Sequence, residues 1–343
     1  MVRMIDVARQ AGVSSKTVSR VLNNEPHVQD AMRERVREAM DRLGYVPSIS
    51  ARSLRSRKSF TIMLLVHDVR SAFVNTVQFG ALRACQELGY HLQLALVSSA
   101  TLESEKGLQN WFEGTLRSGQ PDGFVLFPPM ASNPVVERVV ARMKIAAMRV
   151  GPHNVPDGEH SATVTIDDKL AAYQMTEHLL ELGHKRIAFI RGKEDQFATQ
   201  ARYEGYAQAL GDAGLSVDKR LVLPGTFDFE SGLDAGERLL KRKTPPTAVF
   251  AANDDMATGV IMAAHRAGVD VPKDLSVVGF DDSEVALRTW PALTTVRQPL
   301  EELGVAAVNS LVSAKNTPET RLASATLPFE IILRNSTAAP RES

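Results

Sequence analysis

The sequence predicts a small all-α domain of helix-turn-helix type followed by an α/β core of two doubly wound subdomains. Three observations lead to this fold class. Two short amphipathic segments meet at Gly12, short apolar runs alternate with helical segments from Thr61 onward, and charge is distributed unevenly along the chain. Because 343 residues exceed one ordinary core, we expect at least two parts.

Residues 4–24 have the pattern of two helices joined by a sharp turn. A helix over residues 5–11 ends at Gly12, which can adopt the left-handed conformation that such a turn needs. The hydroxyl of Ser14 can then cap a second helix over residues 15–23. Apolar side chains of the two helices can close a small core, and these are Val7, Ala8, Ala11, Val18, Val21 and Leu22.

The opposite face of the second helix is polar and carries Ser15, Lys16, Ser19 and Arg20. Short hydroxyls and long cations are the side chains that bind phosphates and base edges in nucleic acids. The alternative is an ordinary helical hairpin with a solvated polar face. From this stretch alone the two interpretations are equally supported, because such hairpins are common.

A third amphipathic helix is predicted over residues 29–43, and it ends at Gly44 before Pro47. Three short helices complete a domain of residues 1–47. Residues 48–59 follow as a hinge helix and linker that carries four cations, Arg52, Arg55, Arg57 and Lys58. A helix of this length is marginal alone, so we expect it to be ordered only when something holds it.

The charge distribution supports a nucleic-acid partner for the small domain. The formal net charge of the whole chain is zero. Residues 1–60 contain twelve Lys and Arg against six Asp and Glu, a net of +6, so residues 61–343 carry −6. The positive charge is therefore concentrated where a nucleic acid would lie.

The core has the alternation that is typical of βα units. Short, nearly continuous apolar runs span residues 61–66, 91–97, 123–127, 145–150, 186–190, 247–252 and 275–280. Helical segments between them span about residues 73–88, 102–117, 133–142, 169–182, 200–213, 229–241 and 256–267. Apolar runs of this kind are expected of parallel strands covered on both faces. They are too many for one sheet, and a seam near residues 163–168 would divide them into two halves.

Nothing in the sequence indicates catalysis, a metal or a cofactor. The paired carboxylates Asp254 with Asp255 and Asp281 with Asp282 invite an acid-base interpretation, but adjacent side chains usually point apart. The eight histidines lack a metal-ligand spacing, and the one cysteine, Cys85, falls on an apolar helix where packing is its expected role. We therefore expect no enzyme, no metal site and no cofactor.

The chain shows no signal-peptide pattern and no apolar run of about 18 residues, the length of a membrane span. We expect a cytoplasmic, nucleoid-associated protein with no membrane partner. The tail after Arg334 has no heptad with which to pair dimers, so a homodimer is expected rather than a tetramer.

Two motifs, DVARQAGVSSKTVSRVLNN (residues 6–24) and RLGYVPSISARSLR (residues 42–55), resemble the DNA-binding headpiece and hinge of the lactose-repressor and galactose-repressor (LacI/GalR) family of bacterial transcriptional regulators. The resemblance implies that the second helix enters the major groove and that Leu54 from each of two chains wedges open a base step from the minor groove. The DNA contacts that it implies are Ser14, Ser15, Lys16, Thr17, Ser19, Arg20, Asn23, Ala51, Leu54 and Arg55.

The core, residues 60–343, resembles a periplasmic sugar-binding protein, with FAANDDMATG, DLSVVGFDD, PALTTVRQP and LPFEIILRNST as its clearest markers. The resemblance implies two subdomains with a ligand cleft between them. We expect the first to comprise about residues 60–163 plus 293–325, and the second about residues 164–292 plus 326–335.

Two polar residues stand at predicted strand ends. Asn253 and Asp281 each follow an apolar run, and doubly wound sheets bind ligands beyond the carboxyl ends of their strands. Amide and carboxylate groups suit a polyol. The alternative is that both residues only cap helices, and position alone supports the two interpretations equally. The resemblance favours effector contacts by Asn253, Asp281 and Arg202, and the alternative for Arg202 is a surface ion pair.

Other cleft residues come from the resemblance alone. Phe227 matches a family aromatic that stacks on a ring ligand, and neighbouring Phe229 is the alternative. Phe73 and Arg149 match cleft positions in the first subdomain. Because positions matching Arg149 are often acidic, its arginine points to an anionic or otherwise unusual effector.

The sequence therefore predicts a dimeric transcriptional regulator, a repressor of a carbohydrate-utilisation operon. Its partners would be a double-stranded palindromic DNA operator and a small-molecule effector, a sugar or sugar derivative, that acts allosterically from the cleft. The sign of the effector's action is open. A sugar-binding transport protein is the alternative, which fits the core but leaves the headpiece unexplained.

Overall fold

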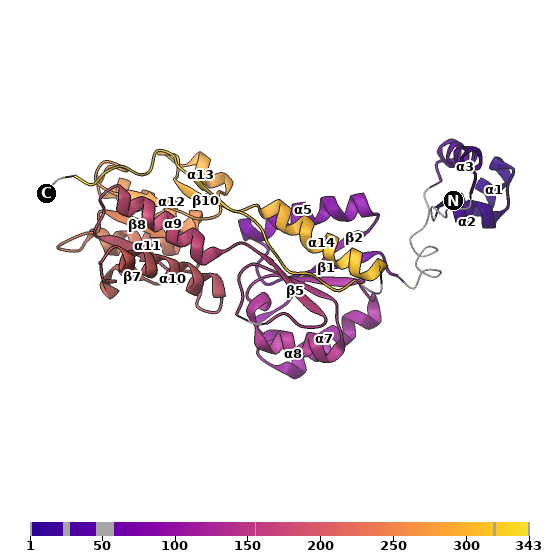
Figure 1. Cartoon of the computed structure of the whole chain (residues 1–343), viewed down its shortest axis with the longest axis horizontal. Coiled ribbons are helices and arrows are strands. Elements are labelled where there is room, and N and C mark those ends of the chain that lie inside the picture. The colour runs from indigo at the N-terminus through magenta and orange to yellow at the C-terminus, as the bar shows by residue number, and fades with distance from the viewer. Residues whose placement is uncertain (1, 23–27, 46–57, 155, 318–319, 342–343) are drawn as a thin grey trace. The chain divides into compact units, whose positions relative to one another are not determined.

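The computed structural model describes residues 2–22, 28–45, 58–154, 156–317 and 320–341. The chain divides into two compact units, Met1–Phe60 and Thr61–Ser343, whose elements are labelled in Figure 1. In the described part of the chain, no helix is both long enough and apolar enough to cross a membrane.

The first unit contains the three predicted helices, α1 (Met4–Ala11), α2 (Ser15–Leu22) and α3 (Asp30–Leu43). Gly12 has φ +63° and closes α1 by donating its N–H to the carbonyls of Ala8 and Arg9. The Ser14 hydroxyl accepts the N–H of Thr17 at 3.1 Å, so its predicted capping role is confirmed. One buried valine from each helix meets in the core, and these are Val7, Val18 and Val36.

The first subdomain of the core is built on a six-stranded parallel sheet in the order β11-β5-β4-β3-β1-β2. The strands are β1 (Thr61–Val66), β2 (His91–Leu96), β3 (Gly123–Leu126), β4 (Ala147–Val150), β5 (Ser161–Thr165) and β11 (Ala325–Thr326). Met63 and Leu65 pack with α7 (Glu105–Ser118) and α8 (Pro134–Met143), and α6 (Ser99–Leu102) precedes α7. The other face is covered by α5 (Ala72–Leu88) and α14 (Leu300–Asn316).

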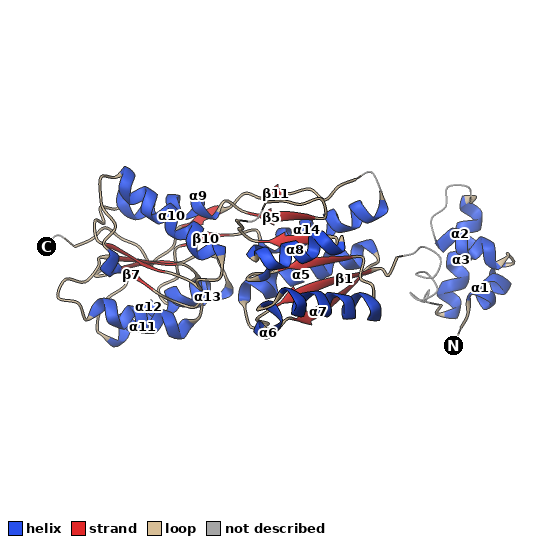
Figure 2. Cartoon of the chain, turned by 90° about the horizontal axis from the view of Figure 1, so that it is seen from below, coloured by secondary structure: helices blue, strands red, loops and turns tan. Residues whose placement is uncertain are grey.

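The second subdomain has a four-stranded parallel sheet in the order β7-β6-β8-β9. Its strands are β6 (Ile187–Ile190), β7 (Val222–Leu223), β8 (Ala248–Ala251) and β9 (Ser276–Val278). Its helices are α9 (Asp168–Glu181), α10 (Phe197–Asp212), α11 (Phe229–Leu240), α12 (Asp254–Arg266) and α13 (Glu284–Arg288). Figure 2 shows helices on both faces of the strands in each subdomain. The doubly wound fold class is confirmed.

The chain passes between the subdomains three times: between β5 and α9, between β10 (Thr295–Arg297) and α14, and between β11 and β12 (Glu330–Ile332). β10 pairs antiparallel with β12, and Leu293 and Val296 are buried in the core of the second subdomain. Residues 293–298, which the sequence analysis grouped with the first subdomain, therefore pack in the second. Three connections restrict how the subdomains can move relative to each other.

Several elements were absent from the sequence-based expectations. All seven expected strands are present, and the chain passes from the first to the second subdomain at the expected seam, between the end of β5 and the start of α9. Neither β5 nor α14 was expected as an element. Cys85 lies fully buried on α5, as expected, and burial raises the pKa of its thiol to about 11.

The contact between α5 and α14 depends on two glycines. These helices come from distant parts of the chain and lie side by side in Figure 1. A Cβ atom at Gly80 would collide with the backbone of Glu301, and a Cβ atom at Gly304 would collide with the carbonyl oxygen of Val77. The two backbones can approach this closely only because both positions lack a side chain.

We predict that Gly304→Ala lowers the free energy of unfolding of the core by about 1–3 kcal/mol, because the added methyl group must push α14 away from α5. Urea denaturation followed by circular dichroism measures the change. Gly114→Ala on α7 is the matched control, since nothing lies within 4 Å of its Cβ position. This control should gain up to about 1 kcal/mol. Equal effects at the two positions would contradict the proposed close contact.

Candidate functional site

The polar face of α2 is accessible in the structure. Ser14, Ser15, Lys16 and Arg20 are exposed, and Thr17 and Ser19 are half-buried. The helix contains no acidic residue, and its first turn presents Ser15 and Lys16 beside the partial positive charge of the helix N-terminus. This surface can therefore bind phosphates and donate hydrogen bonds to base edges.

Not every expected DNA contact can be located. The hydroxyls of Ser14 and Thr17 lie 2.9 Å apart and belong to the cap of α2. Asn23, Ala51, Leu54 and Arg55 lie outside the described residues, as do residues 48–57 of the hinge and linker predicted over residues 48–59.

The core contains a cleft of about 550 Å³ that is lined from both subdomains. The first subdomain contributes His67, Asp68, Arg70, Ser71, Ala72, Phe73, Val74, Pro128 and Pro152. The second contributes Lys193, Gln196, Ala198, Arg202, Thr226, Phe227, Asp228, Phe229, Glu230, Asn253, Asp255 and Asp281. The volume is that of a site for a small organic molecule.

The polar cleft residues follow the carboxyl ends of parallel strands. Asp68 comes two residues after β1, Asn253 comes two residues after β8, and Asp281 follows β9. Parallel strands all end at one edge of their sheet, so side chains far apart in sequence converge there. The expectation that Asn253 and Asp281 lie at strand ends is therefore confirmed.

Arg202 is the most constrained charged residue of the cleft. It is only 4% exposed. Its Nε donates to Asp168 Oδ1 at 2.8 Å, and its Nη1 donates to the carbonyl of Ala252 at 2.5 Å. The guanidinium carbon also lies 3.6 Å from the centre of the Phe280 ring, within cation–π range. The surface ion pair considered for Arg202 is excluded, because its carboxylate partner Asp168 is also buried.

Asp281 shares this arginine at a longer distance, 3.8 Å from Nη1 to Oδ1. Gln298 Nε2 donates to the same carboxylate oxygen at 2.7 Å. Burial raises the pKa of Asp281 to about 6, although the nearby Arg202 charge and the Gln298 hydrogen bond act in the opposite direction. Burial likewise raises the pKa of Asp168, against the effect of Arg202. The single positive charge of Arg202 therefore does not fully offset the cost of burying the two carboxylates, Asp168 and Asp281.

Asn253 both caps a helix and lines the cleft, the two alternatives that its position in the sequence suggested. Its Oδ1 accepts the N–H of Met256 at 3.1 Å and caps α12. Its Nδ2 donates to the carbonyl of Phe227 at 3.0 Å, and the residue lines the cleft. The cap and the cleft position are therefore compatible, since they use different atoms of one side chain.

Three aromatic side chains line the cleft: Phe73, Phe227 and Phe229. Phe73 packs edge-on against Phe127, with ring centres 6.3 Å apart. Phe227 has φ +64°, and its ring occupies the space that a side chain at Gly192 would fill. The ring of Phe227 is therefore held by its surroundings at the cleft wall.

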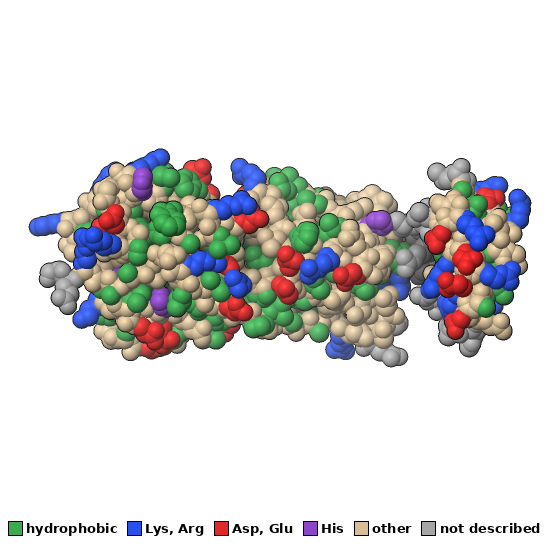
Figure 3. All heavy atoms as spheres, turned by 90° about the horizontal axis from the view of Figure 1, so that it is seen from above, with side chains coloured by type: hydrophobic (Ala, Val, Ile, Leu, Met, Phe, Trp, Pro, Cys, Tyr) green, Lys and Arg blue, Asp and Glu red, His purple; other side chains and the backbone are tan. Residues whose placement is uncertain are grey.

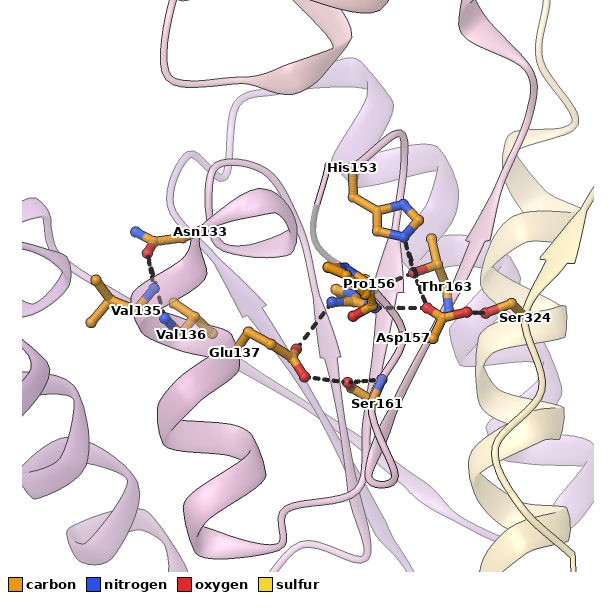
Figure 4. A network of polar contacts seen from close by, with 12 residues as sticks. Asn133, Val135, Val136, Glu137, His153, Pro156, Asp157, Ser161, Thr163 and Ser324 are labelled. Atoms are coloured by element: carbon orange, nitrogen blue, oxygen red, sulfur yellow. Dashed lines mark hydrogen bonds and ion pairs between the residues drawn. The ribbon is translucent and has the colours of Figure 1, made fainter.

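Arg149 does not line the cleft, contrary to its expected role in effector contact. It is 1% exposed in β4, where Nη1 donates to Glu137 at 3.0 Å and Nη2 donates to Asp157 at 2.7 Å. Its Nε donates to Thr163 Oγ1 at 3.1 Å. Figure 4 shows the partners Glu137, Asp157 and Thr163 converging on this network. Two carboxylates neutralise the arginine, so the inference of an anionic effector loses its basis.

The members of each carboxylate pair face different surroundings. Asp254 is buried and accepts from Thr295 Oγ1 at 2.5 Å and from the N–H of Ser283 at 2.8 Å, whereas Asp255 lines the cleft. Asp281 lines the cleft, whereas its neighbour Asp282 pairs with arginines outside it. Adjacent carboxylates therefore do not converge on one atom.

Some cleft residues were missed in the sequence, among them Asp68, Arg70, Lys193, Asp228, Glu230 and Asp255. Asp68 and Lys193 each lie shortly after a predicted strand, and that position was the available signal. Asp255 lies in the first turn of α12, Asp228 and Glu230 lie at the start of α11, and Arg70 lies in the segment between β1 and α5. The apolar pattern does not specify which side chains at these positions face the cleft.

These features define a class of protein in which a helix-turn-helix headpiece is joined to a two-subdomain ligand-binding core. Residues 3–48 match the profile of bacterial regulatory proteins of the lacI family, and residues 176–337 match that of the periplasmic binding protein-like domain. The chain belongs to the lacI family, whose members are DNA-binding transcriptional regulators and not enzymes.

Individual relatives cover almost the whole chain. The ribose operon repressor of Escherichia coli (strain K12) is 35% identical over 93% of this chain and 94% of its own. The solved complex of the transcriptional regulator CelR with cellobiose has a TM-score of 0.73 and 32% identity, covering 98% of this chain and 100% of that chain. The Lac repressor dimer bound to operator and the anti-inducer ONPF has a TM-score of 0.81 and 25% identity, covering 98% and 99%.

Proposed function

We propose that this chain is a dimeric repressor of a carbohydrate-utilisation operon, which binds an inverted-repeat operator and is controlled by a sugar or sugar derivative in the cleft. The observation that carries the proposal is the 550 Å³ cleft, lined by aromatic and hydrogen-bonding side chains, in a chain that also has an exposed cationic helix-turn-helix. The names of the ribose operon repressor and of the CelR–cellobiose complex support a carbohydrate effector.

The chemistry of the cleft suits a carbohydrate. Phe73 and Phe227 offer flat apolar surfaces on which the face of a sugar ring can pack. Asn253, Asp281 and Arg202 add an amide, a carboxylate and a guanidinium, which can accept from and donate to ring hydroxyls. The proposed effector contacts are therefore Phe73, Arg202, Phe227, Asn253 and Asp281, with Phe229 as the alternative ring contact.

Control by the effector would act through the three connections between the subdomains. A ligand that contacts both walls of the cleft favours the arrangement in which those walls are close. In the chain, the hinge directly precedes β1 of the first subdomain, so a change in subdomain arrangement would alter the spacing of two hinges in a dimer. A coupling of about 1–3 kcal/mol would suffice to change operator affinity 5- to 150-fold.

An exposed apolar surface on the first subdomain supports the dimer. Phe79 and Leu82 on α5 and Leu94 and Leu96 on β2 are exposed large hydrophobic side chains. β2 is the last strand of its sheet, so its outer edge is available for pairing. Figure 3 views the molecule from the side that carries α5 in Figure 1, and hydrophobic side chains gather there. A second copy of the chain would bury such a surface.

We predict that Leu96→Lys, at a position with 63% exposure, converts the dimer into monomers because a lysine ammonium would be buried in the interface. Sedimentation velocity at micromolar concentration measures the change. Leu170→Lys on α9 is the matched control, because Leu170 is exposed on the other subdomain and should tolerate the charge. A monomeric wild-type protein, or a Leu96→Lys variant that stays dimeric, would rule out this interface.

We predict that Arg20→Ala weakens operator binding about 5- to 150-fold and relaxes base preference at one position in each half-site, because a base-edge contact is worth about 1–3 kcal/mol. Selection from randomised DNA gives the operator, and fluorescence anisotropy then gives the affinities. Arg42→Ala on α3 is the control, since Arg42 is exposed on the same unit and pairs with Glu38. It should leave base preference unchanged.

The same selection tests the proposed function as a whole. A dimer with two headpieces should enrich sequences that contain an inverted repeat. Failure to enrich any two-fold symmetric site, with or without sugars, would overturn the proposal. Arg20→Ala binding with wild-type affinity and preference would overturn only the role of Arg20.

A further inference from the structure

The charges that line the cleft are unequal in number. Three side chains are cationic, Arg70, Lys193 and Arg202, and five are carboxylates, Asp68, Asp228, Glu230, Asp255 and Asp281. The cleft therefore has an excess of negative charge, which attracts cations and repels anions.

The cations of the cleft already have acidic neighbours. Arg70 pairs with Asp68 at 3.3 Å, and Arg202 is bound to Asp168, which lies outside the cleft lining. The pKa of Asp228 is lowered: burial acts to raise it, but hydrogen bonds from Thr226 and Ser231, together with the charge of Lys193, outweigh burial. Lys193 is near enough to Asp228 and Asp68 to lower the pKa of each carboxyl, but it forms no ion pair within 4 Å with a described residue. This one cation faces two cleft carboxylates, Asp255 and Glu230, that have no partner among the described residues.

Asp255 is half-buried and, like the exposed Glu230, has no internal partner among the described residues. It lines the cleft on the first turn of α12, and no described residue forms a hydrogen bond or an ion pair with it. Burial raises the pKa of Asp255, and the charges of Asp228 and Glu230 raise it further. Its ionised form is therefore destabilised until a positive group enters the cleft.

Asp281 gives an independent indication of a ligand. The residue is 9% exposed and lines the cleft. Gln298 and Arg202 both approach Oδ1, whereas Oδ2 accepts no hydrogen bond from the described residues. Oδ2 is therefore available to accept a hydrogen bond from a ligand in the cleft.

A metal ion does not fit this arrangement. Among the described residues, no group of three His, Cys, Asp or Glu side chains lies close enough to hold one. A neutral sugar would supply hydrogen-bond donors but leave the charge of Asp255 uncompensated. An ammonium group supplies three donors and a positive charge at one atom.

We propose that the effector is an amino sugar, whose protonated amino group binds between Asp255 and Asp281 while its ring packs on Phe227. This inference rests on the proposed effector role of the cleft and narrows the ligand to a cationic carbohydrate. Asp228 and Glu230 contribute negative potential around the ammonium without needing to contact it. The aromatic wall excludes water from the ring face of the ligand.

The test is isothermal titration calorimetry of the full chain with matched sugars at pH 7. The probes are glucosamine, galactosamine and mannosamine, each compared with its parent hexose, its N-acetyl derivative and the hexose 6-phosphate. We expect at least one amino sugar to bind about 10-fold or more tightly than its three matched compounds, because only it carries a positive charge. Asp255→Asn should remove this preference, so that the ratio of the amino-sugar affinity to the parent-hexose affinity falls to about one.

Asp234→Asn is the matched control. Asp234 lies on α11, pairs with Arg238 at 3.4 Å and does not line the cleft, so its replacement should leave every affinity unchanged. Binding of a parent hexose or N-acetyl sugar at least as tightly as its amino sugar would overturn the inference. An amino-sugar preference that survives Asp255→Asn, or no binding of any amino sugar, would also overturn it.

Failure of the inference can be separated from failure of the proposed function by measuring operator binding with the same sugars. If a neutral hexose binds and shifts operator affinity, the amino-sugar inference is wrong and the effector role of the cleft stands. If no sugar that binds changes operator affinity, the effector role itself fails.

Discussion

The arrangement of the cleft depends on one guanidinium shared between buried carboxylates. Arg202 binds Asp168 at 2.8 Å and the carbonyl of Ala252, and it lies 3.8 Å from Asp281. These partners come from the start of α9, the end of β8 and the segment after β9. The arginine therefore joins the first residues of the second subdomain to the carboxyl ends of its sheet. Because each buried carboxylate needs a cation, none of these partners can move independently.

This constraint connects the ligand site to the movable part of the molecule. Asp168 follows the first of the three connections between the subdomains, and Asp281 lines the cleft. A positive ligand group near Asp281 would partly neutralise that carboxylate and weaken its electrostatic attraction to Arg202. The interaction between Arg202 and Asp168 would then strengthen at the point where the chain enters the second subdomain. Ligand charge and subdomain arrangement would thus be coupled through one side chain.

The fold was largely predictable because the sequence shows two clear hydrophobic patterns. The headpiece has the spacing of amphipathic helices, and the core has short apolar runs that alternate with helical segments. Gly12 and the apolar faces indicated the headpiece helices, and seven apolar runs indicated the strands. β5 (SATVT) was missed because a short strand with three hydroxyl residues lacks a continuous apolar run. Strand ends indicated Asn253 and Asp281. The position of Arg149 could not be foreseen, since its burial depends on Glu137 and Asp157, which approach it from other segments.

The most direct test of the shared guanidinium is the pH dependence of stability in Asp281→Asn. The folded pKa of Asp281 is about 6 and its ordinary value is 3.8, so the folded protein binds more protons between these values and loses stability as pH rises through them. The variant avoids this loss. Urea denaturation should show it more stable than wild type by up to about 3 kcal/mol at pH 7.5 and by less than about 1 kcal/mol at pH 4. Equal destabilisation at both pH values would mean that Asp281 has a full cationic partner, contradicting a guanidinium shared among carboxylates.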